Sequence, residues 1–197
     1  MARKVVILII AICFALINTP LQAKAEAVSN LTVKQLIVKH SMELGLDPAL
    51  ALSIAKAESG FCHDKRSRYG AIGVFQLMPA TAKRMGFNPY QLQDNIKGGI
   101  TYYKKMYNMF GSTELALAAY NAGPGNVKKY NGIPPFMETR RFVSSIMSNY
   151  NNLKLHPDPA IAQYKNALKE IADEMTEEDF RMQQDAILKA YLSNQGI

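Results

Sequence analysis

The sequence predicts a mainly α-helical protein with a single compact domain. Apolar residues recur every three or four positions through most of the chain, and no stretch alternates between apolar and polar residues as a half-buried strand would. Proline, glycine and capping residues interrupt this pattern at helix-length intervals. The chain has 197 residues, enough for one domain with a substantial core.

Residues 1–25 have the pattern of a secretory signal peptide. Two basic residues precede an apolar run over residues 5–17, which is too short to span a bilayer comfortably. Small residues follow at Ala23 and Ala25. An uncleaved membrane anchor is the alternative. We expect a periplasmic or secreted protein with no stable membrane span after cleavage.

Removal of this segment would leave Cys62 as the only cysteine. The mature protein would then have no internal disulfide, and its core would depend on packing alone. Cys62 is either a small buried hydrophobic residue or a free thiol. The first is expected, because no histidine and aspartate accompany it in a recognisable catalytic arrangement.

The first two helices have clear boundaries. Thr32 can cap a helix that runs to Gly45. Asp47 and the proline after it suit the start of a second helix, which Gly60 would end.

The remaining segments of the domain are shorter or less regular. Residues 62–75 are expected to form a loop, since they are rich in glycine, serine and charged residues. Four further helices are expected: a short one near Pro79, one following Asn95, one capped by Thr113 and one following Thr139.

Charge and proline content divide the chain near residue 152. Residues 26–155 carry 16 Lys and Arg against 8 Asp and Glu, whereas residues 156–197 carry 4 against 8. We therefore expect a basic domain over residues 26–152 and an acidic helical C-terminal extension over residues 153–197. A basic surface favours an anionic partner, but export argues against nucleic acid.

Glu58 lies on the apolar side of the second helix. On a helical wheel it falls on the same side as Ile54 and Ala51, while Lys56 and Ser53 point to the other, solvent-facing side. A carboxyl in apolar surroundings has a raised pKa, which suits a general acid near neutral pH. An ordinary solvated helix glutamate is the alternative.

Five short segments carry most of the functional information. They are ESGF at 58–61, S-x-x-GAIGVFQLMP at 67–79, NIKGGITYY at 95–103, ALAAYNAGPGNV at 116–127 and GIPPFMET at 132–139. In this order and spacing the chain resembles the family 1 lytic transglycosylases, whose SLT domain is related to goose-type lysozyme. The resemblance covers about residues 32–152.

This resemblance implies a lysozyme-like fold, mainly α within the α+β class, with a groove for peptidoglycan glycan strands. It implies cleavage of the β-1,4 bond between N-acetylmuramic acid and N-acetylglucosamine, with formation of a 1,6-anhydromuramic product. Glu58 matches the single acid/base of the family. The family needs no metal and no cofactor, and the three histidines, His40, His63 and His156, are too far apart in sequence to indicate a metal site.

The resemblance also implies a set of substrate-binding residues: Ser59, Ser67, Gln76, Met78, Tyr120, Asn121 and Glu138. Glu138 lies near a helix start, which should keep it ionised, and it matches a hydrogen-bonding groove residue rather than a nucleophile. Structural roles are the alternatives: Ser59 could end its helix, Met78 could belong to the core, and Glu138 could cap its helix. Phe75 departs from the residue common in the family and could narrow the groove.

The expected function is therefore local remodelling of the cell wall by a lytic transglycosylase. One alternative is a hydrolytic muramidase on the same scaffold, and another is a catalytically silent peptidoglycan-binding module. The presence of Glu58 together with Gln76, Tyr120 and Glu138 argues against the silent module. A secretion or conjugation apparatus is a candidate partner.

Overall fold

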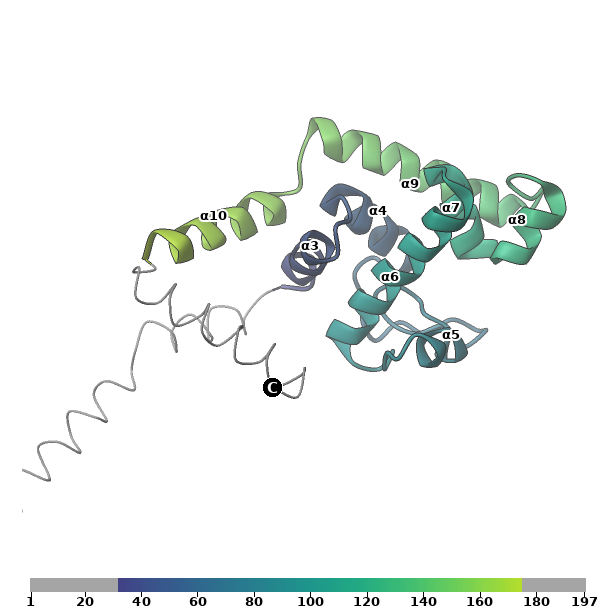
Figure 1. The fold of residues 1–197 in the computed structure, drawn as a ribbon, viewed down its shortest axis with the longest axis horizontal. Coiled ribbons are helices and arrows are strands. Elements are labelled where there is room, and N and C mark those ends of the chain that lie inside the picture. Colours follow the sequence, from purple (N-terminus) through teal and green to yellow (C-terminus); the bar gives the residue numbers. More distant parts are fainter. Residues whose placement is uncertain (1–31, 175–197) are drawn as a thin grey trace, which may run out of the picture. The chain divides into compact units, whose positions relative to one another are not determined.

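The structure, a computed structural model, describes residues 32–174. Within this range there are eight α-helices and no strand (Figure 1): α3 Val33–Glu43, α4 Pro48–Ser59, α5 Pro79–Arg84, α6 Leu92–Phe110, α7 Thr113–Ala122, α8 Pro124–Tyr130, α9 Met137–Leu155 and α10 Pro159–Glu174. The prediction of a mainly helical protein is confirmed. None of these helices is long and apolar enough to cross a membrane. The predicted signal peptide and the last part of the predicted extension lie outside the described residues.

Local capping chemistry fixes the starts of α3 and α4, as predicted. The Gln35 N–H donates to the Thr32 hydroxyl at 3.3 Å, and the Gln35 side chain accepts in return from the Thr32 N–H at 2.9 Å. At α4, the Asp47 carboxylate accepts from the Ala49 N–H at 2.9 Å. Gly60 ends α4 in the left-handed conformation, with φ 65°.

The helix α4 packs against both α3 and α9, and its middle turns are buried on all sides. The expectation that Ser53 faces solvent is therefore wrong, because this residue is 1% exposed. The Ser53 hydroxyl donates to the Ala49 carbonyl at 2.7 Å and accepts from the Asn149 amide of α9 at 2.8 Å. Lys56 is exposed as expected, and its ammonium donates to the Asn149 side-chain oxygen at 2.8 Å.

Three expected helices begin earlier than the sequence-based expectation: α6, α7 and α9, the last of which begins at Met137 and contains Thr139. The helix α6 begins at Leu92, so that Asn95 lies inside its first turns. The N-cap of α7 is Ser112, whose hydroxyl accepts from a backbone N–H, and Thr113 is the first helical residue. The short helix α8, which was not expected, begins directly after Gly123 at a proline, a residue suited to the first helical position.

Within the described part of the chain, residues 32–164 belong to one compact unit, which includes the first turns of α10. Asp158 starts α10 by accepting from the Ala160 N–H at 3.0 Å, and its other oxygen accepts from the Lys34 ammonium of α3 at 2.8 Å. The predicted boundary between residues 152 and 153 falls in the last turn of α9 and stays a prediction.

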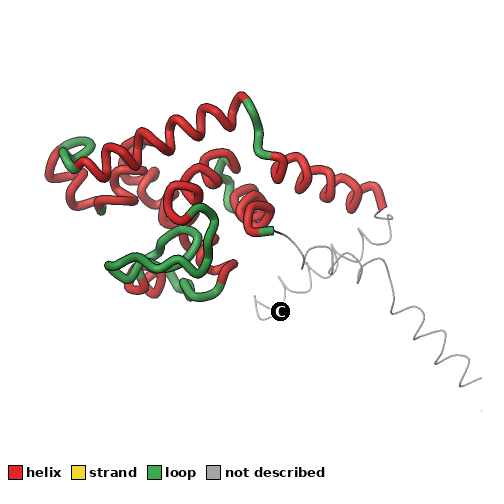
Figure 2. The backbone as a smooth tube through the Cα atoms, turned by 180° about the vertical axis from the view of Figure 1, so that it is seen from behind, coloured by secondary structure: helices red, strands yellow, loops and turns green. Residues whose placement is uncertain are grey.

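A long loop joins α4 to α5 and folds beside α5 and α6 (Figures 1 and 2). Its Phe75 side chain is fully buried, so the idea that Phe75 narrows the groove is wrong. Two successive glycines of α6 make this packing possible. A Cβ at Gly99 would lie 2.3 Å from the Phe75 Cβ, and one at Gly98 would lie 2.8 Å from the Leu77 Cδ1.

Gly99→Ala is therefore expected to destabilise the protein, although alanine is the better helix former. The added methyl group overlaps the stem of Phe75, and overpacking of this kind costs about 1–3 kcal/mol. Gly125→Ala is the matched control, because its Cβ meets nothing within 4 Å in helix α8. Urea unfolding checks the pair. A Gly99→Ala protein as stable as the control would show that Phe75 is not tightly held there.

Candidate active site

An open cavity of about 420 Å³ lies where the end of α4, the long loop, α6, α7 and the start of α9 meet. Its volume is in the range of small-ligand sites. Seven of the eight predicted site residues line it: Glu58, Ser67, Gln76, Met78, Tyr120, Asn121 and Glu138. The exception is Ser59. Seven further residues line the cavity. Three of them have polar side chains, Tyr69, Thr81 and Tyr102, and the other four are Ala71, Leu77, Ala122 and Gly123.

Glu58 is the last residue but one of α4, and it is partly buried at the cavity wall. Burial raises its pKa to about 8, and the charge of Glu138 acts in the same direction, whereas the charge of Lys65 opposes the shift. The carboxyl therefore holds its proton at neutral pH. The expectation of a raised pKa, drawn from the apolar placement of Glu58, is confirmed.

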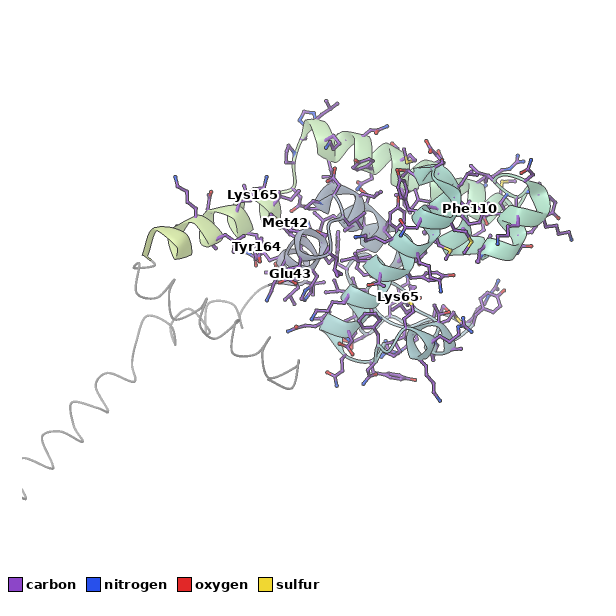
Figure 3. The ribbon with its side chains drawn as sticks, in the orientation of Figure 1. Met42, Glu43, Lys65, Phe110, Tyr164 and Lys165 are labelled. Atoms are coloured by element: carbon purple, nitrogen blue, oxygen red, sulfur yellow. The ribbon has the colours of Figure 1, made fainter. Side chains whose placement is uncertain are left out.

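Lys65 joins the end of α4 to the long loop and is labelled in Figure 3. Its ammonium donates to the backbone carbonyl of Glu58 at 2.7 Å. Its own carbonyl accepts from the Gly73 N–H at 3.0 Å and from the Gln76 side-chain amide at 3.2 Å. Lys65 is thus the positive charge that favours the ionised form of Glu58.

Ser59 does not face the cavity, which corrects its assignment as a substrate-binding residue. The side chain is buried, and its hydroxyl donates to the Val74 carbonyl at 2.9 Å and to the Ala55 carbonyl at 3.3 Å. It therefore holds the long loop against α4, directly beside Glu58. This is a positioning role.

Ser67 and Gln76 each shape the loop and face the cavity. The Ser67 hydroxyl accepts from the N–H groups of Tyr69 at 3.2 Å and Ala71 at 3.0 Å. Gln76 has a left-handed backbone, with φ 45°, and its side-chain nitrogen donates to the Gly73 carbonyl at 2.8 Å. The Gln76 side-chain oxygen accepts from no described residue, so it is available to a donor in the cavity.

Tyr120 lines the cavity with a side chain that is almost completely buried. Its ring is 8% exposed and lies 5.1 Å from the ring of Tyr102, measured between centroids. Its hydroxyl donates to the Phe75 carbonyl at 2.8 Å. Burial, together with the nearby Glu58, raises the pKa of Tyr120 well above its ordinary value, so the hydroxyl stays protonated.

Asn95 is a positioning residue that the sequence pattern did not indicate. It is fully buried, and its side-chain oxygen accepts from the Phe75 N–H at 2.9 Å. Its amide nitrogen donates to the carbonyls of Ile72 at 2.7 Å and Pro89 at 3.0 Å. The backbone of Phe75 is therefore fixed on both sides, with its N–H bound by Asn95 and its carbonyl bound by Tyr120. The sequence signal that could have indicated this role is the position of Asn95, a polar residue, on the apolar face of α6.

The α7–α9 side of the cavity is held by one side-chain hydrogen bond. The buried Thr139 hydroxyl donates to the Asn121 side-chain oxygen at 2.8 Å, which turns the Asn121 amide nitrogen away from α9. Glu138 lies in the first turn of α9 with an exposed side chain. Met78 is 43% exposed, as expected of a groove residue rather than a core residue.

The free cysteine and one of the histidines lie outside the cavity. Cys62 is an exposed free thiol, so the expectation that it is buried is wrong. His40 is buried, with its Nδ1 2.7 Å from a Glu43 carboxylate oxygen. No group of three or more His, Cys, Asp and Glu side chains within the described part of the chain is arranged to hold a metal ion.

Comparison with known proteins relates this chain to an enzyme family. The transglycosylase SLT domain family matches residues 35–143. The transglycosylase of Enterobacteria phage PRD1 is 32% identical over 122 residues, which cover 61% of this chain and 44% of the phage protein. The soluble lytic murein transglycosylase of Escherichia coli K12 is 31% identical over 143 residues, covering 60% of this chain and 22% of that protein.

Solved structures agree with the sequence comparison. An inactive Glu-to-Gln mutant of the lytic transglycosylase Slt from Pseudomonas aeruginosa has a TM-score of 0.54 and 31% identity, covering 63% of this chain and 24% of that one. The 70 kDa soluble lytic transglycosylase of Escherichia coli has a TM-score of 0.55 and 28% identity, covering 64% and 25%. This chain thus spans less than half the length of these relatives. It belongs to the transglycosylase SLT domain family.

Proposed function

We propose that this chain is a peptidoglycan lytic transglycosylase. It would cleave the β-1,4 bond between N-acetylmuramic acid and N-acetylglucosamine and form a 1,6-anhydromuramic end. The observation that carries the proposal is a single carboxyl with a pKa of about 8, that of Glu58, in an open cavity of an SLT domain. Among residues 32–174, Glu138 is the only other carboxylate that lines this cavity.

In the first step, the protonated Glu58 acts as the general acid. It donates its proton to the glycosidic oxygen, and the bond from that oxygen to the muramic C1 breaks. The sugar oxygen leaves as a neutral hydroxyl, and Glu58 becomes ionised. The ammonium of Lys65 favours this charge, so it stabilises the carboxylate as the proton leaves.

In the second step, the ionised Glu58 acts as the general base. It takes the proton of the muramic C6 hydroxyl, and the C6 oxygen attacks C1 of the same sugar. The anhydro ring closes, Glu58 regains its proton, and no water is consumed. Most glycosidases use two carboxylates, one of them to activate water or attack C1. Here the substrate N-acetyl group would assist at C1, and Glu138 would accept a hydrogen bond from the glycan.

The polar groups around Glu58 suit a neutral, hydroxyl-rich ligand. The side-chain oxygen of Gln76 is a free acceptor, and the oriented amide of Asn121 is a donor. Met78 offers an exposed apolar surface beside them. A sugar ring, with hydroxyl edges and apolar faces, matches this mixture.

Activity is expected to fall when the pH rises through about 8. Only the protonated Glu58 can start the reaction, so kcat/KM should drop about tenfold per pH unit above the pKa. Lys65→Met removes the charge that lowers this pKa and should move the midpoint to higher pH, while Lys65→Arg should leave it in place. Initial rates on soluble glycan at several pH values measure the profile. A rate that is flat from pH 7 to 10 would contradict a proton-donating Glu58.

We further propose that the protein acts outside the cytoplasmic membrane, where peptidoglycan is found. The signal-peptide pattern of residues 1–25 supports this. N-terminal sequencing of exported material tests it, and a protein that still begins at Met1 would contradict it. Local opening of the wall for a secretion or conjugation apparatus fits one compact catalytic unit, and co-purification with such an apparatus tests that part.

The activity itself is tested by the products released from purified sacculi. Anhydromuropeptides support the proposal. Products with reducing muramic acid ends would favour the hydrolytic muramidase instead, and binding without release would favour the silent module.

A further inference from the structure

Tyr69 is an aromatic ring that lines the cavity and remains largely open to solvent. It is 69% exposed, whereas Tyr120 in the same cavity is 8% exposed. Tyr69 sits in a tight turn, in which the Gly70 N–H donates to the Ser67 carbonyl at 3.0 Å and the Tyr69 N–H donates to the Ser67 hydroxyl at 3.2 Å. The turn therefore holds the backbone of Tyr69 at the cavity edge. A rigid, exposed aromatic ring offers a large contact area at low entropic cost.

Arg68 lies directly over this ring. Its guanidinium carbon is 4.6 Å from the ring centroid of Tyr69, a cation–π arrangement. The other two cations of the loop have backbone partners: Lys65 donates to the Glu58 carbonyl, and Arg66 donates to the His63 carbonyl. Arg68 makes no hydrogen bond or ion pair with any described residue. Its planar set of donors is therefore available to an external acceptor.

We propose that Arg68 and Tyr69 form a subsite for the peptide-bearing muramic acid unit of peptidoglycan. The Tyr69 ring packs against the apolar face of the sugar, and the Arg68 guanidinium pairs with a carboxylate of the stem peptide. The inference rests on the proposed function. It assigns a preference, within that substrate class, for glycan whose stem peptides carry free carboxylates.

The chemistry of the ligand supports this pairing. The sugar chain itself offers hydroxyl and acetamido groups, which are neutral, while the stem peptide attached to muramic acid carries carboxylates. Arginine binds a carboxylate through two parallel N–H donors, which gives direction as well as affinity. Because Tyr69 and Glu58 line one cavity, a muramic unit at the reacting position brings its peptide close to the loop.

The test compares two ligands that differ in peptide charge alone. One is a muropeptide with two disaccharide units and free peptide carboxylates, and the other is the same molecule with those carboxylates converted to amides. Binding is measured by titration calorimetry to the full chain carrying Glu58→Gln, which holds the ligand uncut. This protein should bind the free carboxylate form about tenfold more tightly, a gain within the range of charged hydrogen bonds, and the gap should shrink at high salt.

Substitutions then assign the effect to the subsite. Added to Glu58→Gln, Arg68→Gln should remove the difference between the two ligands, and Arg68→Lys should restore part of it. Tyr69→Ala should weaken both ligands by a similar factor. Lys105→Gln is the matched control, because Lys105 is exposed and does not line the cavity. It should behave like the parent protein.

Two results would overturn the subsite. One is an Arg68→Gln protein that still prefers the free carboxylate form by the full factor. The other is an equal loss in Arg68→Gln and Lys105→Gln, which would mean general charge attraction. If Tyr69→Ala binds both ligands as tightly as the parent protein, the proposed packing of Tyr69 against the sugar is wrong. Cleavage of sacculi by the wild-type protein is measured separately. If sacculi are cleaved but Arg68→Gln does not change the ligand preference, the subsite is wrong and the proposed function stands. If Arg68→Gln removes the preference but sacculi are not cleaved, the proposed function is wrong and the subsite stands.

Discussion

Glu58→Gln is expected to abolish cleavage while leaving the fold and glycan binding intact. Glutamine keeps the size of the side chain but has no proton to donate and cannot serve as a base. Both steps of the reaction would fail, and each acid–base step is worth roughly 10²–10⁴-fold. The rate of product release from sacculi should therefore fall by at least about a thousandfold. Binding should persist because the neighbours Gln76 and Asn121 are unchanged.

Glu138→Gln is the matched comparison, since it removes the other carboxylate of the cavity. Its proposed role is to accept a hydrogen bond from the glycan, so measurable turnover should remain. If the Glu138 variant is inactive and the Glu58 variant still releases product at nearly the wild-type rate, the general acid has been assigned to the wrong residue.

The Glu58→Gln protein should also differ from the wild type in how its stability depends on pH. The pKa of Glu58 is raised in the folded state from 4.5 to about 8, so its stabilising effect is complete below pH 4.5 and is lost as the pH rises to about 8. Glutamine does not titrate. The two proteins should have similar unfolding free energies near pH 4.5. The variant should then gain over the wild type by about 1.4 kcal/mol per pH unit up to about pH 8, where the difference levels off. Parallel stability curves from pH 4.5 to 8.5 would mean that Glu58 is ionised in the folded protein.

Asn95→Ala is expected to have the largest effect on stability. It would leave two buried backbone groups without a partner, the Phe75 N–H and the Pro89 carbonyl, while the Ile72 carbonyl would keep only its bond from the Leu77 N–H at 2.9 Å. Each unpaired group costs about 1–3 kcal/mol, so the pair costs about 2–6 kcal/mol, a large part of the total stability of a typical domain, about 5–15 kcal/mol. The variant should be unfolded or barely stable at 37 °C, as circular dichroism would show.

Asn126→Ala is the control for this prediction. Its amide makes one hydrogen bond, to the Ala122 carbonyl at 2.8 Å, at a partly buried position. The expected cost is about 1 kcal/mol. If Asn95→Ala melts at the same temperature as this control, the long loop is held mainly by the packing of Phe75 and not by Asn95.

The features that the sequence predicted correctly depend on neighbours along the chain. The side chains of Thr32 and Asp47 cap their helices by accepting from backbone N–H groups three and two residues further along the chain. The apolar placement of Glu58 follows from residues one and two turns earlier on the same helix, and it correctly indicated a raised pKa. Several short motifs in a fixed order then sufficed to place most of the cavity lining.

The features that the sequence did not predict depend on distant contacts. Ser53 has the spacing of a surface residue, yet it is buried by α9 through Asn149, 96 positions away. The burial of Phe75 requires the absence of a side chain at Gly99. The role of Asn95 likewise arises only when the long loop folds onto α6. No local pattern specifies which surface each of these residues will meet.

The central claim is that Glu58 carries out both steps without water, and the products test it most directly. Sacculi are incubated with the wild-type protein in water enriched in heavy oxygen, and the released muropeptides are analysed by mass spectrometry. We expect 1,6-anhydromuramic ends, each lighter by one water than a reducing end and free of heavy oxygen. Reducing muramic acid ends that contain heavy oxygen would contradict it.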